Sequence, residues 1–515
     1  MRRFAFLCVS ALALAGCAAV GPTYKAPRIA APAAYQGAAA LASTPRTAVN
    51  DQEADLSRWW LGFSDPELQR LIERAMDANL NLDQAASRIR EARYQEIVAG
   101  APGLPQVNAT GNAQHEHISK NAFPPGFASL LGGGGSGGSA GGSGGSSSGG
   151  SSSSSSVFAL PGSGINLYQV GFDASWEIDV FGGVRRAVEA AKAQAQAAVW
   201  SRRDAEVSLA AEVASAYFSL RADQRRIAVY QAEVQRQQGL FTLIRDRRSV
   251  GVATSLDTER QQNQIANAQA RLPALQADAA AQIHALGVLL GEPPEDLAQE
   301  LSQAAPIPAP PPAIPAGLPS DLLARRPDVR QAERNLAAAS ARIGVATAEL
   351  YPQITITGSA DLVSTALKTL LRWSSRQYSI AGAVNWPLLD GGKAHADIAI
   401  AREQYLQALD GYRNALLTAL RDVEDALSRC AADQAQGQAL ARSLQSAGRT
   451  ETIARQQYEV GLVDYSDVLN ANAGVLSAED QIAQNDAALS RDTASLYKAL
   501  GGGWTPSCDQ CAAAK

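Results

Sequence analysis

Three segments of this chain alternate regularly between apolar and polar or small residues. Apolar side chains occupy alternate positions from Tyr168 to Val180, from Ile354 to Leu362 and from Tyr378 to Leu388. A weaker version of the same pattern runs from Val107 to Ala113. Period-two alternation is typical of a β-strand whose two faces meet different environments. The pattern therefore predicts four strands arranged as two hairpins.

Long helices are predicted after each hairpin. Ala, Gln, Arg and Glu dominate residues 184–248 and 393–459, and shorter helical stretches occupy 256–290 and 467–500. A helix of about 65 residues rising 1.5 Å per residue would span close to 100 Å. Pro273 predicts a kink or a break in the first of the shorter helices. Spacings of three and four, as in a coiled-coil seam, join Val207, Ala210, Ala214, Tyr217 and Arg221.

The chain is internally duplicated. Residues 83–111 are similar to 330–358, Val250-Gly251 recurs as Val460-Gly461, and Leu290-Gly291 recurs as Leu500-Gly501. A repeat this long is two copies of a large unit rather than a solenoid of short modules. The first repeat covers residues 65–303, with its hairpin at about 105–180. The second covers 320–504, with its hairpin at 352–389.

The hairpins have the character of membrane strands. Lengths of about 9–13 residues suit tilted strands that cross a bilayer. The alternative is a soluble sandwich with one wet face, but no further strands are predicted that would form a second sheet. An open four-stranded sheet is not viable in lipid, so a dimer or a trimer would have to close it, and a trimer gives the wider bore. Aromatic residues lie near the strand ends, where interfacial girdles occur: Tyr168, Tyr351, Trp373, Tyr378 and Trp386.

The N-terminus reads as a secretory leader. Basic residues precede an apolar run from Phe4 to Leu14, and Leu14-Ala15-Gly16 precede Cys17. This matches a bacterial lipobox, so residues 1–16 are predicted to be a signal peptide and Cys17 the lipidated first residue. An ordinary signal peptide with an incidental cysteine is the alternative. Ala18, rather than an aspartate, favours passage to the outer membrane.

Composition divides the rest of the chain. Residues 17–64 are predicted to be extended, 304–319 are a proline-rich connector, and 505–515 form a tail. Residues 131–156 are almost entirely Gly and Ser, which cannot bury enough apolar surface to fold. Cys430 is expected to be packed within a helix. Cys508 and Cys511 lie in the tail, where a disulfide is plausible and a zinc site is not.

Residues for chemistry are few. The net charge is −5, and −7 without Arg2 and Arg3, so the clustered positive charge that nucleic-acid binding requires is not expected. His115 and His117 share one strand face, but two ligands alone do not make a metal site. The sequence indicates no phosphate-binding loop, no nucleophile–base set and no convergent carboxylate pair in a folded pocket. The sequence predicts no enzyme, no cofactor and no metal.

Three segments carry a family resemblance. Residues 59–68 (WWLGFSDPEL), 318–333 (LPSDLLARRPDVRQAE) and 497–504 (YKALGGGW) strongly resemble the outer-membrane efflux lipoproteins of the TolC superfamily, of the NodT-type, OprM-like group. The resemblance covers nearly all of the chain after the leader. Arg325 and Arg326 in the second segment are expected to be structural, near a helix start.

The resemblance implies an internally duplicated α+β membrane protein. It would form a homotrimer, with a twelve-stranded outer-membrane β-barrel (four strands per chain) continued by a long α-helical barrel in the periplasm. Such channels are passive exit ducts that work with a periplasmic adaptor (membrane fusion) protein and an inner-membrane, proton-driven RND-type pump. They export drugs, dyes or solvents. The alternatives are the outer-membrane channel of type I protein secretion and, less favoured, a trimeric surface adhesin.

The resemblance also implies roles near two helix–helix turns. The adaptor would contact Val250, Gly251 and Val252 in one turn, and Val460, Gly461 and Leu462 in the other. The periplasmic gate would include Asp467, an aspartate of a cation-selective aperture, with Asp464, the gate tyrosine Tyr458, and Asp257 as the first-repeat counterpart of Asp467. Asn470 replaces the next acidic position, so the resemblance does not extend to a doubled acidic ring. A helix N-terminal acid favoured by the helix dipole is the alternative role for Asp467.

Overall fold

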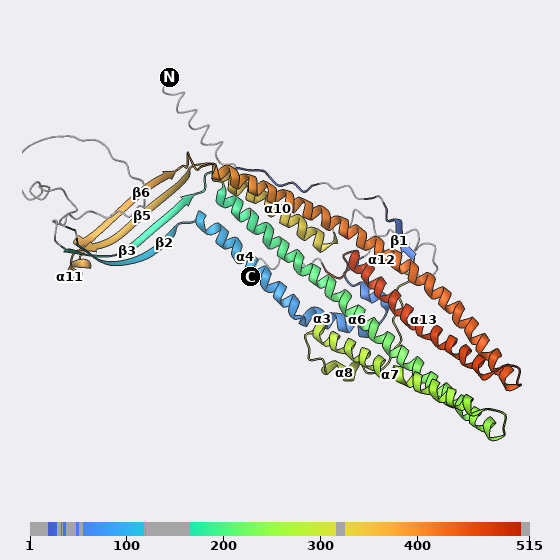
Figure 1. Cartoon of the computed structure of the whole chain (residues 1–515). Helices are drawn as coiled ribbons and strands as arrows, with labels where there is room; N and C mark the ends of the chain where they lie inside the picture. Colours follow the sequence, from blue (N-terminus) through green and yellow to red (C-terminus); the bar gives the residue numbers. More distant parts are fainter. Residues whose placement is uncertain are drawn as a thin grey trace, which may run out of the picture. The chain divides into compact units, whose positions relative to one another are not determined.

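One antiparallel sheet contains the four predicted strands. The computed structural model describes residues 55–117, 164–315 and 325–505, together with 19–27, 32, 34–37, 48–50 and 119. The strands are β2 (Gln106–His117), β3 (Gly164–Ile178), β5 (Gln353–Ser364) and β6 (Arg376–Asn385), in the order β2-β3-β5-β6 (Figure 1). All four predicted strands are thus confirmed, and β2 extends four residues beyond the weak pattern that indicated it.

The sheet joins the two repeats through the pair β3 and β5. Trp176 lies opposite Ile356, Asp173 opposite Ser359 and Gly171 opposite Asp361. A slip by one residue would move every side chain to the other face, so the alternating pattern specifies this register. Strands β2 and β6 are the two edges of the sheet in a single chain.

The long helices match their predicted bounds within two residues. They are α6 (Gly183–Ser249), α7 (Ser255–Leu290), α12 (Lys393–Glu459) and α13 (Tyr465–Ala499). The shorter elements are η1 (Trp59–Phe63), α3 (Pro66–Ala78), α4 (Leu80–Gly100), η2 (Ala101–Gly103), α8 (Asp296–Leu301), α10 (Pro327–Ala348), α11 (Leu367–Leu370) and η5 (Trp373–Ser375). Added to the sheet, they give the expected α+β class with predominantly helical content.

A break at Pro273 does not occur. Helix α7 continues through this residue for all of its 36 positions. Proline removes the hydrogen bond to the carbonyl four residues earlier, which belongs to Gln269. Pro273 and Gln269 are both exposed, so water can satisfy this carbonyl and the helix can continue.

The proline-rich connector is only partly as expected. Its residues Ala313–Pro315 form a short strand, β4, which pairs in parallel with β1 (Ala48–Asn50). Polyproline and β backbones are close in conformation, and a proline is tolerated at the end of an edge strand. The extended connector therefore forms a short parallel ladder, because a second extended segment, β1, pairs with it.

The described residues form two compact units that cut across the two repeats. One comprises residues 1–21, 98–186 and 344–397, and includes the four-stranded sheet. The other comprises residues 22–97, 187–343 and 398–515, and includes most of the helical residues. Each unit therefore takes segments from both repeats.

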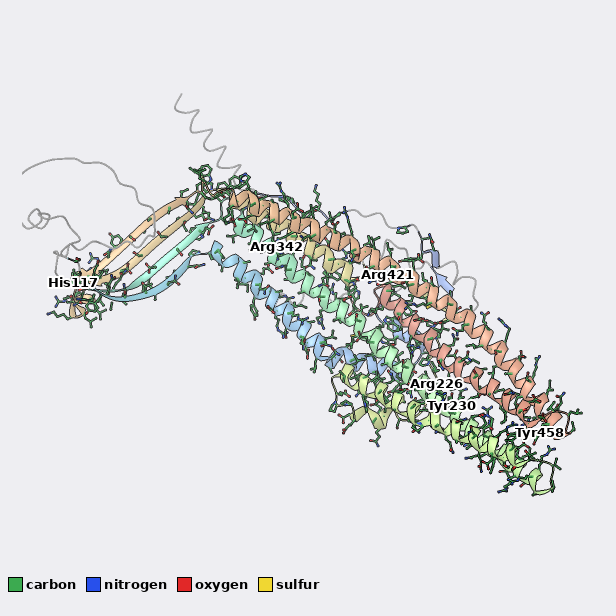
Figure 2. All side chains as sticks on the ribbon, viewed as in Figure 1. His117, Arg226, Tyr230, Arg342, Arg421 and Tyr458 are labelled. Carbon is green, nitrogen blue, oxygen red and sulfur yellow. The ribbon has the colours of Figure 1, made fainter. Side chains whose placement is uncertain are left out.

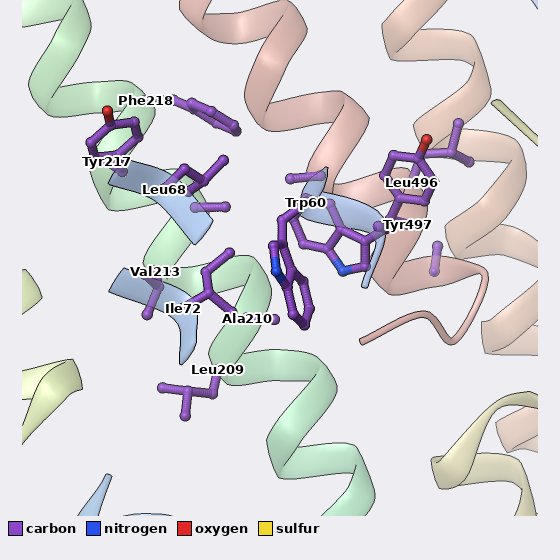
Figure 3. Close-up of a cluster of buried hydrophobic side chains, with 14 of the residues drawn as sticks. Trp60, Leu68, Ile72, Leu209, Ala210, Val213, Tyr217, Phe218, Leu496 and Tyr497 are labelled. Atoms are coloured by element: carbon purple, nitrogen blue, oxygen red, sulfur yellow. The ribbon is translucent and has the colours of Figure 1, made fainter. Parts of the chain in front are cut away.

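The helical unit has one main hydrophobic core. Its largest fully buried side chains include Tyr217 and Phe218 on α6 and Leu68 and Ile72 on α3 (Figure 3). The predicted seam is confirmed, because Val207, Ala210, Ala214, Tyr217 and Arg221 are all buried. Cys430 is also buried, as expected, and burial raises the pKa of its thiol to about 12.

The segments that carry the family resemblance close this core. Asp65 caps α3 by accepting from the backbone amides of Glu67 and Leu68 at 2.9 and 3.0 Å, and its other oxygen accepts from the Tyr217 hydroxyl at 2.9 Å. Trp59 stacks on Tyr497 with ring centroids 5.2 Å apart.

The expectations on Cys17, residues 131–156, Cys508 and Cys511 concern residues outside those that the structure describes.

Candidate functional site: the paired helix turns

The turns that join α6 to α7 and α12 to α13 lie at the same end of the helical unit (Figure 1). In each turn a glycine adopts the left-handed conformation: φ is 79° at both Gly251 and Gly461. The amide of Val252 donates to the Arg247 carbonyl at 2.9 Å, and the amide of Leu462 donates to the Gln457 carbonyl at 2.8 Å. These bonds satisfy helix-terminal carbonyls, and glycine permits the backbone to reverse without strain.

The predicted adaptor-contact side chains are exposed at these turns. Val250, Val252, Val460 and Leu462 expose 73%, 63%, 70% and 75% of their surfaces. Each of the two matched turns thus presents two exposed apolar side chains at the end of the unit. Exposed apolar groups gathered in this way are typical of an interaction site.

The two predicted gate aspartates have different environments. Asp257 is engaged in a capping box: its carboxylate accepts from the Thr254 amide at 3.0 Å and from the Thr254 hydroxyl at 2.7 Å. Its counterpart Asp467 is exposed, as are Asp464 and Asn470. Asp464, the N-cap of α13, makes no side-chain capping bond. Equivalent positions of the two repeats therefore differ. The Asp257 carboxylate stabilises the start of its own helix, whereas the carboxylates of Asp467 and Asp464 face solvent.

Arg247 links the two turns. Its guanidinium donates to the carbonyls of Tyr458 and Glu459, each at 3.4 Å, and lies 4.8 Å from the centre of the Tyr458 ring. These carbonyls end α12, where the helix dipole attracts a cation. Tyr458 lies near this turn (Figure 2), and its contact with Arg247 therefore connects the helix pair α12–α13 to the helix pair α6–α7. Burial raises the pKa of the Tyr458 hydroxyl, although the Arg247 charge opposes this effect.

A second link lies beneath Arg247. The Tyr465 hydroxyl donates to the Gln261 amide oxygen, and Gln261 Nε2 donates to the Gln237 carbonyl at 2.6 Å. Tyr465 and Gln261 are both buried, and burial raises the pKa of the Tyr465 hydroxyl. A small apolar cluster surrounds this link: Ile244, Ala454, Tyr465, Val468 and Ala471. The turns thus have a packed core of their own, separate from the main core.

Sequence reasoning missed Arg247, Gln261 and Tyr465. Arg247 and Arg248 form a basic pair in the last turn of α6, whereas the corresponding positions of the second repeat are Gln457 and Tyr458. This departure from the internal repeat was a usable signal, because it places a cation in one helix end only. Gln261 and Tyr465 gave no comparable signal.

A carboxyl pair lies elsewhere between α12 and α13. Burial, followed by hydrogen bonding to the Asp492 carboxyl, raises the pKa of Asp433 from 3.8 to about 7. The Asn485 amide donates to the Asp433 backbone carbonyl at 3.1 Å, which fixes the helices at this point. The folded protein therefore binds a proton here that the unfolded chain releases.

Replacing Asp433 with asparagine is expected to flatten the pH dependence of stability. The raised pKa makes the free energy of unfolding fall as pH rises from about 4 to 7, because the folded state binds more protons in this window. After allowance for solvent screening, the cost at pH 8 is about 1–2 kcal/mol. Asparagine keeps a donor for Asp492 and removes the charge. Chemical unfolding of the detergent-solubilised protein at pH 5 and pH 8 measures the difference.

The control for this experiment is Asp410→Asn, because Asp410 lies on the same helix with 73% of its side chain exposed. Its stability curve should match that of the wild type. Identical pH slopes for Asp433→Asn and the wild type would show that the carboxyl pair does not retain a proton.

Among the helices of the described residues, none is both long and apolar enough to cross a bilayer. The chain matches the family model described as outer membrane efflux protein over residues 71–292 and 318–502. The chain belongs to this family. The efflux family is one of channels rather than enzymes.

Two curated relatives and one solved structure give the degree of similarity to this efflux channel. Outer membrane protein OprJ of Pseudomonas aeruginosa is 32% identical over 98% of this chain and 97% of the relative. Pyoverdine export outer membrane protein OpmQ of the same species is 30% identical over 88% of each chain. The solved outer-membrane channel OprN covers 95% of this chain and 100% of its own, with a TM-score of 0.81 and 30% identity. The protein is an efflux channel of the outer membrane that extends into the periplasm.

Proposed function

We propose that the protein is the passive exit duct of a tripartite efflux system and works as a homotrimer. The observation that carries the proposal is a four-stranded sheet whose edges, β2 and β6, have no further strand paired with them among the described residues. Backbone groups at such edges cannot remain unpaired in lipid, so neighbouring copies must pair with them. Three copies would supply twelve strands, wide enough for an aqueous lumen.

The partners follow from the family and from the turns. A periplasmic adaptor would bind the exposed apolar side chains of the turns at Val250–Val252 and Val460–Leu462, and an inner-membrane RND-type pump would supply energy and direction. Asp467, Asp464, Tyr458, Asn470 and Asp257 would surround the periplasmic gate. The duct itself would need no cofactor, metal or catalytic residue, and would bind no nucleic acid.

The cargo is proposed to be small molecules such as drugs, dyes or solvents. Relatives of this chain are named for export of pyoverdine, antibiotics and toluene, all small compared with a secreted protein. Type I protein secretion is therefore the second candidate. Deleting the gene should sensitise cells to several dyes and antibiotics, and a plasmid copy should restore resistance. Unchanged susceptibility over a broad panel, together with loss of a secreted protein, would favour the second candidate.

The N-terminus is proposed to be processed at residues 1–16 and acylated on Cys17, which lies outside the described residues. Residues 17–64 would then run from the acylated end to the first repeat. Labelling cells with radioactive palmitate tests this step, because Cys17→Ser should abolish incorporation. Persistent label would remove the lipoprotein assignment and leave the channel assignment intact.

Asp467→Ala is expected to reduce cation selectivity in bilayer recordings. Three exposed carboxylates around a narrow bore would concentrate cations, and their removal should lower the cation-to-anion permeability ratio about two- to tenfold. Asp257→Ala is the matched comparison, because the capping box engages that carboxylate in the first repeat. It should alter stability more than selectivity. Equal selectivity in Asp467→Ala and the wild type would leave Asp467 only the role of a helix N-terminal acid.

A further inference from the structure

The chain just after the proposed acylation site is held at the start of α6. Arg186 donates from Nε to the Val20 carbonyl at 2.9 Å and from Nη2 to the Gly21 carbonyl at 3.2 Å and the Ala19 carbonyl at 3.5 Å. The Val20 amide donates to the Phe181 carbonyl at 3.0 Å. Arg186 is only 7% exposed, so its fork of donors is committed to this segment in a largely water-free place.

Glycines create the space for these contacts. A Cβ on Gly344 would lie 2.8 Å from Arg186 Cγ, and a Cβ on Gly21 would lie 2.5 Å from the Gly344 Cα. A Cβ on Gly182, where φ is +82°, would lie 2.5 Å from the Ala19 Cβ. We call Arg186, Gly182 and Gly344 the N-terminal socket.

The socket combines the two repeats: Arg186 and Gly182 lie in the first and Gly344 lies in the second. At the positions that correspond by repeat, Ala396 in the second repeat stands in place of Arg186, and Ile97 in the first stands in place of Gly344. Gly392 corresponds to Gly182 and also has positive φ, but no atom of the described residues lies within 4 Å of its Cβ position. The shared glycine serves the strand-to-helix turn, whereas Arg186 and Gly344 occur only at the junction that receives the N-terminal segment.

The aromatic residues at this junction are of the kind found at a membrane–water boundary. Phe181 stacks on Tyr351 with ring centroids 4.7 Å apart. The Trp176 and Trp386 indoles donate to the carbonyls of Gly103 and Leu350, at 3.0 and 3.1 Å, where each hairpin begins. Tryptophan and tyrosine with one bonded polar end and one apolar face are typical of the interfacial belt of membrane proteins.

We propose that the N-terminal socket sets the depth of the lipid anchor, so that the acyl chains on Cys17 enter the same leaflet as the ends of the strands. Cys17 precedes Ala19 by two residues, which allows a Cα separation of at most about 7 Å. The anchor is then held beside the strands, and strands and acyl chains meet the phospholipid together. Two attachments fixed at one depth hold a protein to a membrane more firmly than a single loose one. The proposal rests on the proposed acylation and not on any particular cargo.

Hydrogen exchange tests the contact in the full-length acylated protein. In Arg186→Ala, amides of residues 18–24 should exchange about tenfold faster or more, because the segment loses its donors. Arg186→Lys should be intermediate, since lysine keeps the charge and loses the fork. Gly344→Leu should resemble Arg186→Ala. Lys393→Ala, a cation removed from the corresponding helix start of the second repeat, should exchange as the wild type does. Equal exchange in Arg186→Ala and the wild type would overturn the socket.

Insertion into phospholipid vesicles tests the role of the anchor. Arg186→Ala should slow formation of inserted, protease-resistant protein several-fold when Cys17 is acylated. With Cys17→Ser behind an ordinary signal peptide, insertion should be slow and the same with or without Arg186. An equal slowing by Arg186→Ala in both forms would assign Arg186 to folding of the sheet and overturn the proposal. Vesicle insertion requires no pump or drug, so its outcome is independent of the export test.

Discussion

Replacing Arg247 with alanine is expected to raise the open probability of the reconstituted channel, because a link between the two turns would hold the proposed gate closed. Arg247 is bonded to the last two carbonyls of α12 and lies over the Tyr458 ring, so it ties one helix turn to the other. A charged donor at a helix C-terminus and a cation–π contact together contribute about 1–3 kcal/mol. Removing both should shift the ratio of open to closed channels about tenfold, because 1.4 kcal/mol corresponds to a factor of ten.

Single-channel recording in planar bilayers measures this change, and the neighbouring arginine is the control. Arg248 donates to the Thr258 hydroxyl at 3.2 Å. Both residues belong to the helix pair α6–α7, so this bond does not join the two turns. Arg248→Ala should therefore leave the open probability close to that of the wild type. Equal effects of the two substitutions would indicate a general loss of charge at the turn rather than a broken link.

Replacing Arg326 with alanine is expected to destabilise the helical unit by about 3–5 kcal/mol, the usual cost of removing one partner from a buried ion pair. Arg326 is 8% exposed and binds Asp328 through two bonds, of 3.0 and 2.6 Å. It also donates to Asp422 at 3.3 Å and to the Ala499 carbonyl at 3.0 Å. The substitution would leave carboxylates without their cation where α10, α12 and the end of α13 meet.

Arg421 provides the matched control for Arg326, because it also pairs with Asp422, at 2.7 Å, but its side chain is 65% exposed. Arg421→Ala should change the free energy of unfolding by no more than about 0.5 kcal/mol. Arg326→Lys should fall between the two, since lysine cannot reproduce the bidentate contact with Asp328. Urea unfolding in detergent measures all three, and equal losses for Arg326→Ala and Arg421→Ala would contradict the assignment.

Arg326 shows how far a motif could be interpreted. The sequence LARRPDV resembles a known family and suggested a structural role for Arg325 and Arg326 near a helix start. The structure confirms this position for Arg326, but the Asp422 and Ala499 contacts join residues 96 and 173 positions apart. No local pattern specifies which distant carboxylate an arginine meets, because that depends on how the helices pack.

The predicted gate residues show a second limit of interpreting the sequence, because positions that are equivalent by repeat have different local bonding. Asp257 and Asp467 are equivalent by repeat, yet the hydroxyl of Thr254 makes one a capping residue, whereas Asp464 in the same place makes no such bond. The capping box was readable from the residues, since a threonine three positions before an acid is a known helix start. The assignment of Asp257 to the gate rests on the equivalence of the repeats and stays a prediction beside this capping role.

The sequence by itself determined the four strands, the bounds of the long helices, the duplication and the family. These properties depend on period-two and period-3.6 patterns, or on motifs a few residues long, and such signals are local. Only the tertiary structure decided that Arg247 meets Tyr458, that Arg186 meets Val20, and that Pro273 leaves α7 unbroken. The first two contacts join residues 211 and 166 positions apart, and whether a proline breaks a helix depends on whether water reaches the carbonyl that it leaves unbonded.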